Sequence, residues 1–259
     1  MEASKTNLVD SGARGARAQW FGTKCPLKTS LVLPMFNEGP SVDTTMGTAL
    51  AELEKHFEDY EIVVVDDAST DGCAQRVAQW VARDRHIRLV RLSRNQRFGG
   101  ALRAGLAAAT MDYIVYTDFD LQVGLDCLPQ MMGEFGDADI LTGYSAAQVK
   151  HANWRSALIS KGYNFLVRTL FGLRLRDINF GFKAIRKSVY DERHLQSCSP
   201  FVDAEMFVQA EALGCIIKEV PVPFFLRQSG VSHIRRWDVI AWTFWDMLCV
   251  RCRLWLRRW

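Results

Sequence analysis

The segment Met111-Asp-Tyr-Ile-Val-Tyr-Thr-Asp-Phe-Asp-Leu-Gln122 decides how the rest of the chain is interpreted. Residues 113–117 are apolar, β-branched or aromatic, which predicts a short buried strand. Two carboxylates, Asp118 and Asp120, follow where that strand should end, and Gln122 adds an amide oxygen. At the C-terminal edge of a parallel sheet, such groups lie in the crevice where open α/β sheets bind ligands.

These three side chains offer oxygen donors of the kind that Mg²⁺ and Mn²⁺ prefer, and such a cation would in turn bind a diphosphate. The alternative is that Asp-x-Asp after a strand belongs to an ordinary turn, because Asp side chains also hydrogen-bond to turn backbone. The tripeptide alone favours the turn, so the choice depends on the rest of the chain.

The first half of the chain alternates between strand and helix patterns. Strands are expected at 29–35, 61–65, 87–92, 113–117 and 139–142. This alternation predicts an α/β fold with a Rossmann-like, mostly parallel sheet flanked by helices. The chain lacks Gly-x-Gly-x-x-Gly after the first strand and Gly-x-x-x-x-Gly-Lys-Ser/Thr anywhere, which disfavours dinucleotide oxidoreductases and P-loop NTPases.

Polar side chains gather at one end of these strands. Asp66 and Asp67 follow the second strand, Asn95 the third, and Asp118 and Asp120 the fourth. Turns alone would require polar residues at both ends of the strands, whereas the carboxyl ends of parallel strands form a single ligand-binding edge. The pattern therefore predicts a nucleotide site that uses carboxylates and a metal ion.

The second half predicts two helices, at 153–171 and 203–213, and a strand at 216–223. Between the helices lies a tight, glycine-containing segment at 177–183, and after the strand comes a polar loop from Arg227 to His233. Asp203 and Glu205 open the second helix, where acidic side chains also complement the helix dipole.

The tail from Trp237 to Trp259 holds five of the eight tryptophans. Asp246 and Arg251 interrupt it too soon for a transmembrane helix. We expect residues 234–259 to form an amphipathic, interfacial helix on an anionic membrane surface, with Asp246 and Arg253 opposite its apolar side. A helix docked on the domain core or on a partner subunit is the alternative. Residues 1–28 lack sustained periodicity and predict a flexible leader.

Four segments together resemble the family 2 glycosyltransferases of GT-A fold. They are Pro34-Met-Phe-Asn37-Glu38, Val65-Asp-Asp-Ala-Ser-Thr-Asp71-Gly72, Asn95 with Gly99-Gly100-Ala101, and Asp118-Phe-Asp120-Leu-Gln122. The likeness is greatest to the polyprenyl-phosphate branch, typified by dolichyl-phosphate mannose synthase and bacterial polyprenyl-phosphate glucosyltransferases. It implies a GT-A domain over residues 29–233.

The resemblance implies a role for each matching position. Base, ribose and other substrate contacts would come from Pro34, Phe36, Glu38, Asp66 or Asp67, Asn95, Gly99, Asp118 and Phe119. The metal ligands would be Asp118, Asp120 and Gln122. Arg155, Arg227 and His233 would surround the donor and acceptor phosphates. Two positions depart from the family pattern, since Phe36 replaces a tyrosine and His233 a lysine.

The chemistry of the acceptor decides which other groups are needed. A cation held by Asp120 would stabilise the leaving diphosphate. A phosphate monoester, whose second pKa is about 6, attacks without a base but needs cations, which Arg155, Arg168, Lys183 and Arg227 would supply. A sugar hydroxyl needs a general base, for which Asp203 and Glu205 are the candidates.

These observations favour an inverting, metal-dependent hexosyltransferase. It would move mannose or glucose from a nucleotide-diphosphate sugar to a polyprenyl (dolichyl or undecaprenyl) phosphate, as a peripheral protein at the cytosolic face of a membrane. The alternatives are a family 2 enzyme acting on a glycan hydroxyl and a non-catalytic nucleotide-sugar-binding module. The net charge of +3 gives no reason to expect a nucleic-acid partner. A membrane-protein partner that takes up the lipid product is left open.

Overall fold

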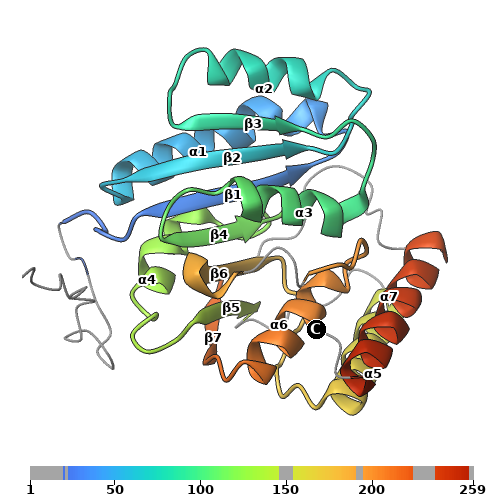
Figure 1. Ribbon diagram of the computed structural model, residues 1–259. Coiled ribbons are helices and arrows are strands. Elements are labelled where there is room, and N and C mark those ends of the chain that lie inside the picture. Colours follow the sequence, from blue (N-terminus) through green and yellow to red (C-terminus); the bar gives the residue numbers. More distant parts are fainter. Residues whose placement is uncertain (1–19, 21–22, 146–153, 191–194, 224–236, 257–259) are drawn as a thin grey trace, which may run out of the picture.

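The fold is built on one twisted sheet. The computed structural model describes residues 20, 23–145, 154–190, 195–223 and 237–256. Within these residues a seven-stranded sheet has the order β3-β2-β1-β4-β6-β5-β7 (Figure 1). Its strands are β1 (Thr29–Met35), β2 (Tyr60–Asp66), β3 (Ile87–Arg91), β4 (Tyr113–Thr117), β5 (Ile140–Ser145), β6 (Phe182–Arg186) and β7 (Ile217–Val222).

The sheet is mostly parallel, as the sequence predicts, and β6 is the exception. It runs antiparallel to both β4 and β5, although the sequence analysis assigned its first residues to a tight turn. The segment Phe-Lys-Ala-Ile-Arg shows no clear strand pattern because Lys183 interrupts the apolar residues. Lys183 is nevertheless fully buried. The charged residue that made this segment look unlike a strand therefore lies inside the protein.

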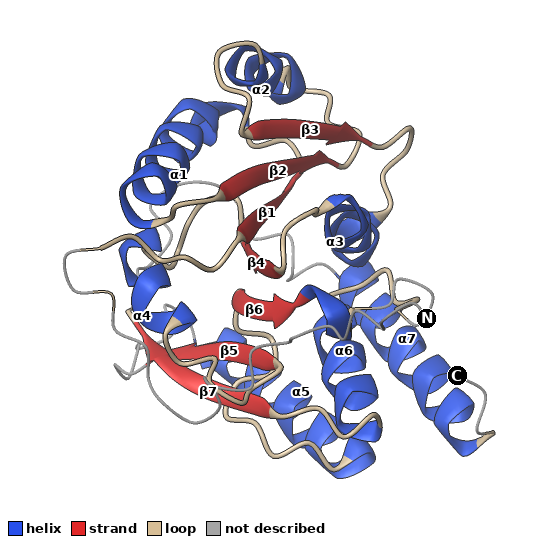
Figure 2. Cartoon of the chain, turned by 60° about the vertical axis from the view of Figure 1, so that its left-hand side comes forward, coloured by secondary structure: helices blue, strands red, loops and turns tan. Residues whose placement is uncertain are grey.

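Helices cover both faces of the sheet (Figure 2). Their bounds are α1 (Val42–His56), α2 (Cys73–Val81), α3 (Arg97–Ala108), α4 (Leu128–Met132), α5 (Trp154–Phe171), α6 (Val202–Ala212) and α7 (Trp237–Trp255). Side chains of β1 alternate between two hydrophobic cores, one on each face of the sheet. Leu31 and Leu33 pack on one face with α1, α2 and α4. Val32 packs on the other side with α3, α5, α6 and α7. This alternation is the period of two that a strand covered on both faces requires.

The parallel strands bring their polar C-terminal residues to one edge. β1 pairs in parallel with both β2 and β4, and β2 with β3. Asp66 and Asp120 therefore lie at the same edge, as the sequence predicts. β6 runs the opposite way, and its first residue, Phe182, pairs with Thr117 at the end of β4. The Gly181 backbone thereby reaches the same edge.

The ends of the domain differ from the predicted boundaries. Cys25 is fully buried, and its N–H donates to the His56 carbonyl over 2.7 Å, so the packed domain begins before Thr29. At the other end Met247 and Val250 of α7 are buried in the core that includes α3 and α6. None of the helices in the described part of the chain combines the length and apolar composition needed to cross a bilayer.

Gly105 of α3 tests the packing of helix on sheet. A Cβ at this position would lie 2.3 Å from Val32 Cγ1 and 3.0 Å from Val65 Cγ2. Because valine side chains cannot easily move aside, Gly105→Ala should destabilise the protein by about 1–3 kcal/mol in urea unfolding. Gly162→Ala in α5 is the matched control, since a Cβ there meets nothing within 4 Å, and it should stabilise by up to about 1 kcal/mol. Equal effects of the two substitutions would contradict this packing.

Candidate active site

The loops after β1 and β2 are joined by hydrogen bonds into one rim. The Asn37 N–H donates to Ser69 Oγ over 3.0 Å, and the Asn37 side-chain oxygen accepts the Thr70 N–H over 2.9 Å. The Gly39 N–H donates to Asp71 Oδ2 over 2.7 Å. These bonds fix the position of the half-buried residues Pro34, Phe36 and Glu38, which the sequence analysis assigned to the nucleotide.

Asp66 and Asp67, at the end of β2, accept hydrogen bonds from the neighbouring loops. Asp66 is fully buried, accepts the Ser69 N–H over 3.0 Å and lies 3.3 Å from Arg91 Nε. Asp67 Oδ1 accepts the Gln96 N–H over 2.6 Å, and the Asp67 carbonyl accepts the Asn95 side-chain amide over 3.3 Å. The second carboxylate therefore holds the loop between β3 and α3 against the end of β2.

Backbone strain concentrates at this edge. Among the described residues, four that are not glycine have a left-handed backbone, with φ values between 49° and 62°. They are Asn37, Ala68, Arg97 and Leu121, and they follow β1, β2, β3 and β4 respectively. Such conformations cost energy and are found preferentially at ligand sites, where the surrounding structure holds them in place.

The predicted metal ligands share one turn after β4. The Leu121 N–H donates to the Asp118 carbonyl over 3.1 Å and closes the turn. Gln122 Nε2 donates to Asp120 Oδ2 over 3.0 Å. Gly181 lies against the third member of the group, because a Cβ on it would come within 2.4 Å of Asp118 Oδ2. This contact could not be predicted from the sequence, because the contact depends on the antiparallel course of β6.

This donor set fits Mg²⁺ or Mn²⁺ bound together with a substrate. The described residues contain no cluster of three or more His, Cys, Asp or Glu side chains that could hold a metal by themselves. Two carboxylates and an amide oxygen leave coordination positions for water and for phosphate oxygens. Mg²⁺ is commonly held in this way at phosphate-transfer sites.

Lys183 and Asp203 do not occupy the positions that the sequence analysis gave them. Lys183 Nζ lies 3.0 Å from Asp203 Oδ2 and donates to the Phe180 carbonyl over 2.6 Å. Tyr116 Oη donates to Asp203 Oδ1 over 2.6 Å, and burial together with the charge of Asp203 raises the pKa of Tyr116 well above its usual value. Lys183 is therefore not an exposed phosphate-binding cation, and Asp203 is not an exposed general base.

Three further assignments change for similar reasons. Phe119 is 3% exposed, packs in the α1 core and accepts the Thr45 hydroxyl through its carbonyl, so it is a packing residue. The Gly99 N–H donates to the Cys198 carbonyl over 3.0 Å, which prevents that N–H from binding phosphate. Glu205 is fully buried and accepts the Gln196 and Ser197 N–H groups.

The remaining predicted phosphate ligands follow elements that end at this edge. Arg227 and His233 come after β7 and lie outside the described residues, as does the side chain of Arg155 at the start of α5. Arg168, the other candidate cation, donates to the carbonyls of Leu175 and Arg176. Its role in the described structure is to hold the loop after α5.

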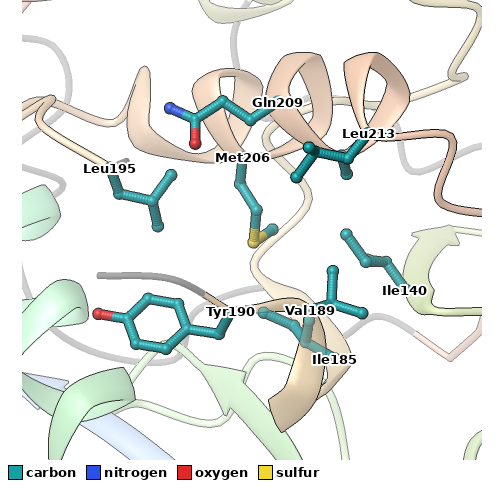
Figure 3. Close-up of a pocket in the computed structure, with 9 residues that line it drawn as sticks. Ile140, Ile185, Val189, Tyr190, Leu195, Met206, Gln209 and Leu213 are labelled. Carbon is teal, nitrogen blue, oxygen red and sulfur yellow. The ribbon is translucent and has the colours of Figure 1, made fainter. Parts of the chain in front are cut away.

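An apolar pocket lies away from this site (Figure 3). Its lining includes Ile140, Ile185, Tyr190, Met206 and Gln209. Ile185 pairs with Ile114 near the start of β4, so this pocket is near the opposite edge of the sheet from Asp118. The pocket lies between β6 and α6, and no carboxylate is part of its lining.

The sequence is similar to those of known glycosyltransferases. Residues 30–193 match the model of glycosyl transferase family 2. Glycosyltransferase AglD from Haloferax volcanii is 28% identical over 77% of this chain and 33% of its own length. Dodecaprenyl-phosphate galacturonate synthase from Rhizobium johnstonii is 29% identical over 82% of this chain and 64% of its own length. The chain thus spans between one third and two thirds of the length of these relatives.

Solved structures confirm the fold. Glucosyl-3-phosphoglycerate synthase from Mycobacterium tuberculosis, solved with Mn²⁺, UDP and glucosyl-3-phosphoglycerate, matches with a TM-score of 0.65 at 18% identity. The match covers 87% of this chain and 80% of that one. The GT-A fold expected from the sequence is therefore correct.

Asp67→Asn tests the buried carboxylate. Burial raises the pKa of Asp67 to about 6, so the folded protein holds this proton more tightly than the unfolded chain does. That contribution to stability is complete below about pH 4 and is lost as the pH rises through about 6. Relative to Asp67→Asn, the wild type should lose about 2–3 kcal/mol of unfolding free energy between about pH 4 and pH 7. If the difference in unfolding free energy between the wild type and Asp67→Asn stayed constant across this pH range, the pKa of Asp67 would not be raised in the folded protein.

Gly181→Ala tests the contact with Asp118. The added Cβ should displace the Asp118 carboxylate, a flexible group, and so weaken Mn²⁺ binding about 10-fold or more with little loss of stability. Electron paramagnetic resonance of free Mn²⁺ in the presence of UDP or GDP measures the first effect, and thermal unfolding the second. Gly47→Ala is the control, because its nearest contact would be 3.7 Å away on Trp80. Unchanged Mn²⁺ affinity in Gly181→Ala would show that the contact is unimportant.

Proposed function

Because the chain belongs to glycosyl transferase family 2, we propose that it transfers a hexose from a nucleotide-diphosphate sugar to a polyprenyl phosphate. The observation that carries the proposal is the meeting of Asp118, Asp120 and Gln122 with the joined loops after β1 and β2 at one edge of the sheet. The acceptor class is supported by the relative named dodecaprenyl-phosphate galacturonate synthase.

The donor would be held from two sides. Phe36 and Glu38 on the rim, together with Asp67, would contact the base and ribose. Asp118, Asp120 and Gln122 would hold Mg²⁺ or Mn²⁺, which supplies positive charge to the departing diphosphate. The hydrogen bonds of the rim would fix Phe36 and Glu38 before the donor binds, which reduces the entropy cost of orienting it.

The acceptor explains why the site needs no exposed base. Both carboxylates proposed from the sequence as bases, Asp203 and Glu205, are buried and already hydrogen-bonded. A phosphate monoester is largely dianionic at neutral pH and attacks without giving up a proton. Direct attack on the anomeric carbon would invert its configuration. Arg155, Arg227 and His233 are the proposed cations for the acceptor phosphate.

The acceptor also implies where the reaction takes place. A polyprenyl phosphate is embedded in a membrane, and nucleotide sugars are water-soluble. We therefore place the protein at the cytosolic face as a peripheral enzyme, with residues 234–259 near the membrane surface. A membrane-protein partner for the lipid product remains part of this proposal.

Transfer assays with purified protein test the proposed reaction. Labelled UDP-glucose, GDP-mannose and UDP-galacturonic acid are each supplied with Mn²⁺ and undecaprenyl phosphate in detergent micelles. One donor should give a labelled lipid, and Asp120→Ala should reduce its formation about 100-fold or more. Asp126→Ala, an exposed carboxylate in the next turn, is the control and should retain activity.

Three results would contradict the proposal in whole or in part. Transfer that Asp120→Ala leaves unchanged would remove the metal role. Transfer to glycan hydroxyls but not to undecaprenyl phosphate would favour the other family 2 reaction, and binding without turnover across all donors would favour a non-catalytic module.

A further inference from the structure

The charged side of α7, which the sequence places opposite the apolar side, faces into the protein. Asp246 Oδ2 accepts the N–H groups of Cys198 and Ser199 over 3.0 and 2.9 Å. Arg253 Nη1 lies 3.5 Å from Glu205 Oε1. Met247, between them, is 2% exposed. These contacts attach the helix firmly to the domain and use its polar groups for that purpose.

The opposite side of α7 is apolar and exposed. We call it the outer face, and it consists of Phe244, Trp245, Leu248 and Trp255. Their exposed fractions range from 51% to 79%. Soluble proteins seldom leave so many large apolar side chains together on one helix without a partner. The outer face therefore requires an occupant.

Composition and charge indicate that this occupant is a lipid surface. Tryptophan is enriched where proteins meet lipid headgroups, because its ring is apolar and its N–H is polar. After Val231 the sequence has six arginines and two aspartates, a net charge of +4 that complements anionic lipids.

The side of α7 next to the outer face adjoins the candidate active site. The Arg97 guanidinium stacks over the ring of Trp242 at 4.2 Å. Arg97 is the first residue of α3 and directly follows Gln96, whose N–H donates to Asp67. Figure 1 shows α7 beginning on the side to which the arrowheads of β2 and β3 point. A membrane in contact with α7 would therefore lie beside the edge that carries Asp118 and Asp120.

From these contacts we infer that the outer face of α7 docks on an anionic membrane while the helix stays attached to the domain by Asp246 and Arg253. The domain then binds as one rigid body, with its ligand-binding edge at the level of the headgroups. This inference rests on the proposed function, because it names the surface that brings the enzyme to its lipid acceptor.

Sedimentation with vesicles tests the docking surface. The full chain is mixed with phosphatidylcholine vesicles, with or without about 30% phosphatidylglycerol, and without any polyprenyl phosphate. The wild type should bind the anionic vesicles, and high salt should weaken this binding. Leu248→Glu on the outer face should reduce it about 10-fold or more.

Leu213→Glu is the matched control. Leu213 follows α6 and is 68% exposed, against 56% for Leu248, so the two substitutions add the same charge at similarly exposed leucines. The control should bind vesicles like the wild type, and thermal unfolding checks that both variants are folded. Equal vesicle binding by Leu248→Glu and the wild type would overturn the inference. The inference would also be overturned if the wild type formed a dimer that did not bind vesicles and if Leu248→Glu dissociated that dimer.

The detergent assay separates this inference from the proposed reaction. Leu248→Glu should retain transfer to undecaprenyl phosphate in micelles, because Leu248 lies outside the donor site. Vesicle binding without transfer by the wild type would reject the reaction and leave the docking surface standing. Transfer in micelles with vesicle binding that Leu248→Glu does not change would reject the docking surface alone.

Discussion

The candidate active site depends on the parallel pairing of β1 with β2 on one side and β4 on the other. This pairing brings the loops that carry Asn37, Asp67 and Asp118 to one edge of the sheet. Each loop contains a residue with a left-handed backbone, and hydrogen bonds join the loops after β1 and β2. The proposed donor would therefore meet a preformed surface, which lowers the ordering cost of binding.

A buried ion pair supports this edge from inside the protein. Lys183 joins the carboxylate of Asp203 to the carbonyl of Phe180, and the next residue, Gly181, touches Asp118. Buried charges are costly unless they are paired and hydrogen-bonded, and here Tyr116 supplies the additional bond. The pair connects β4, β6 and α6 directly behind the turn that carries the carboxylates, so it would help to position that turn.

Sequence reasoning succeeded where one local pattern had one structural meaning. Strands ending in Asp66 and Asp118 had to share an edge once the crossovers were parallel, and the fold followed. The sequence was misleading where charged side chains are buried, because a lysine or an aspartate is normally expected to be exposed to solvent. For this reason β6, which contains Lys183, was not predicted as a strand, and Asp203 was proposed as a general base. The contacts of α7 with the domain could not be predicted, because Asp246 and Arg253 satisfy groups that are distant in the chain, at Cys198 and Glu205.

The proposed function requires Asp118, Asp120 and Gln122 to bind a nucleoside diphosphate through a divalent cation. Isothermal titration calorimetry of the whole chain with UDP and with GDP, in Mn²⁺ and then in excess chelator, measures this binding. We predict a heat of binding for at least one nucleotide in Mn²⁺ and its loss in chelator. Binding of equal strength in chelator, or no heat with either nucleotide, would show that these residues do not hold a metal-bound nucleotide.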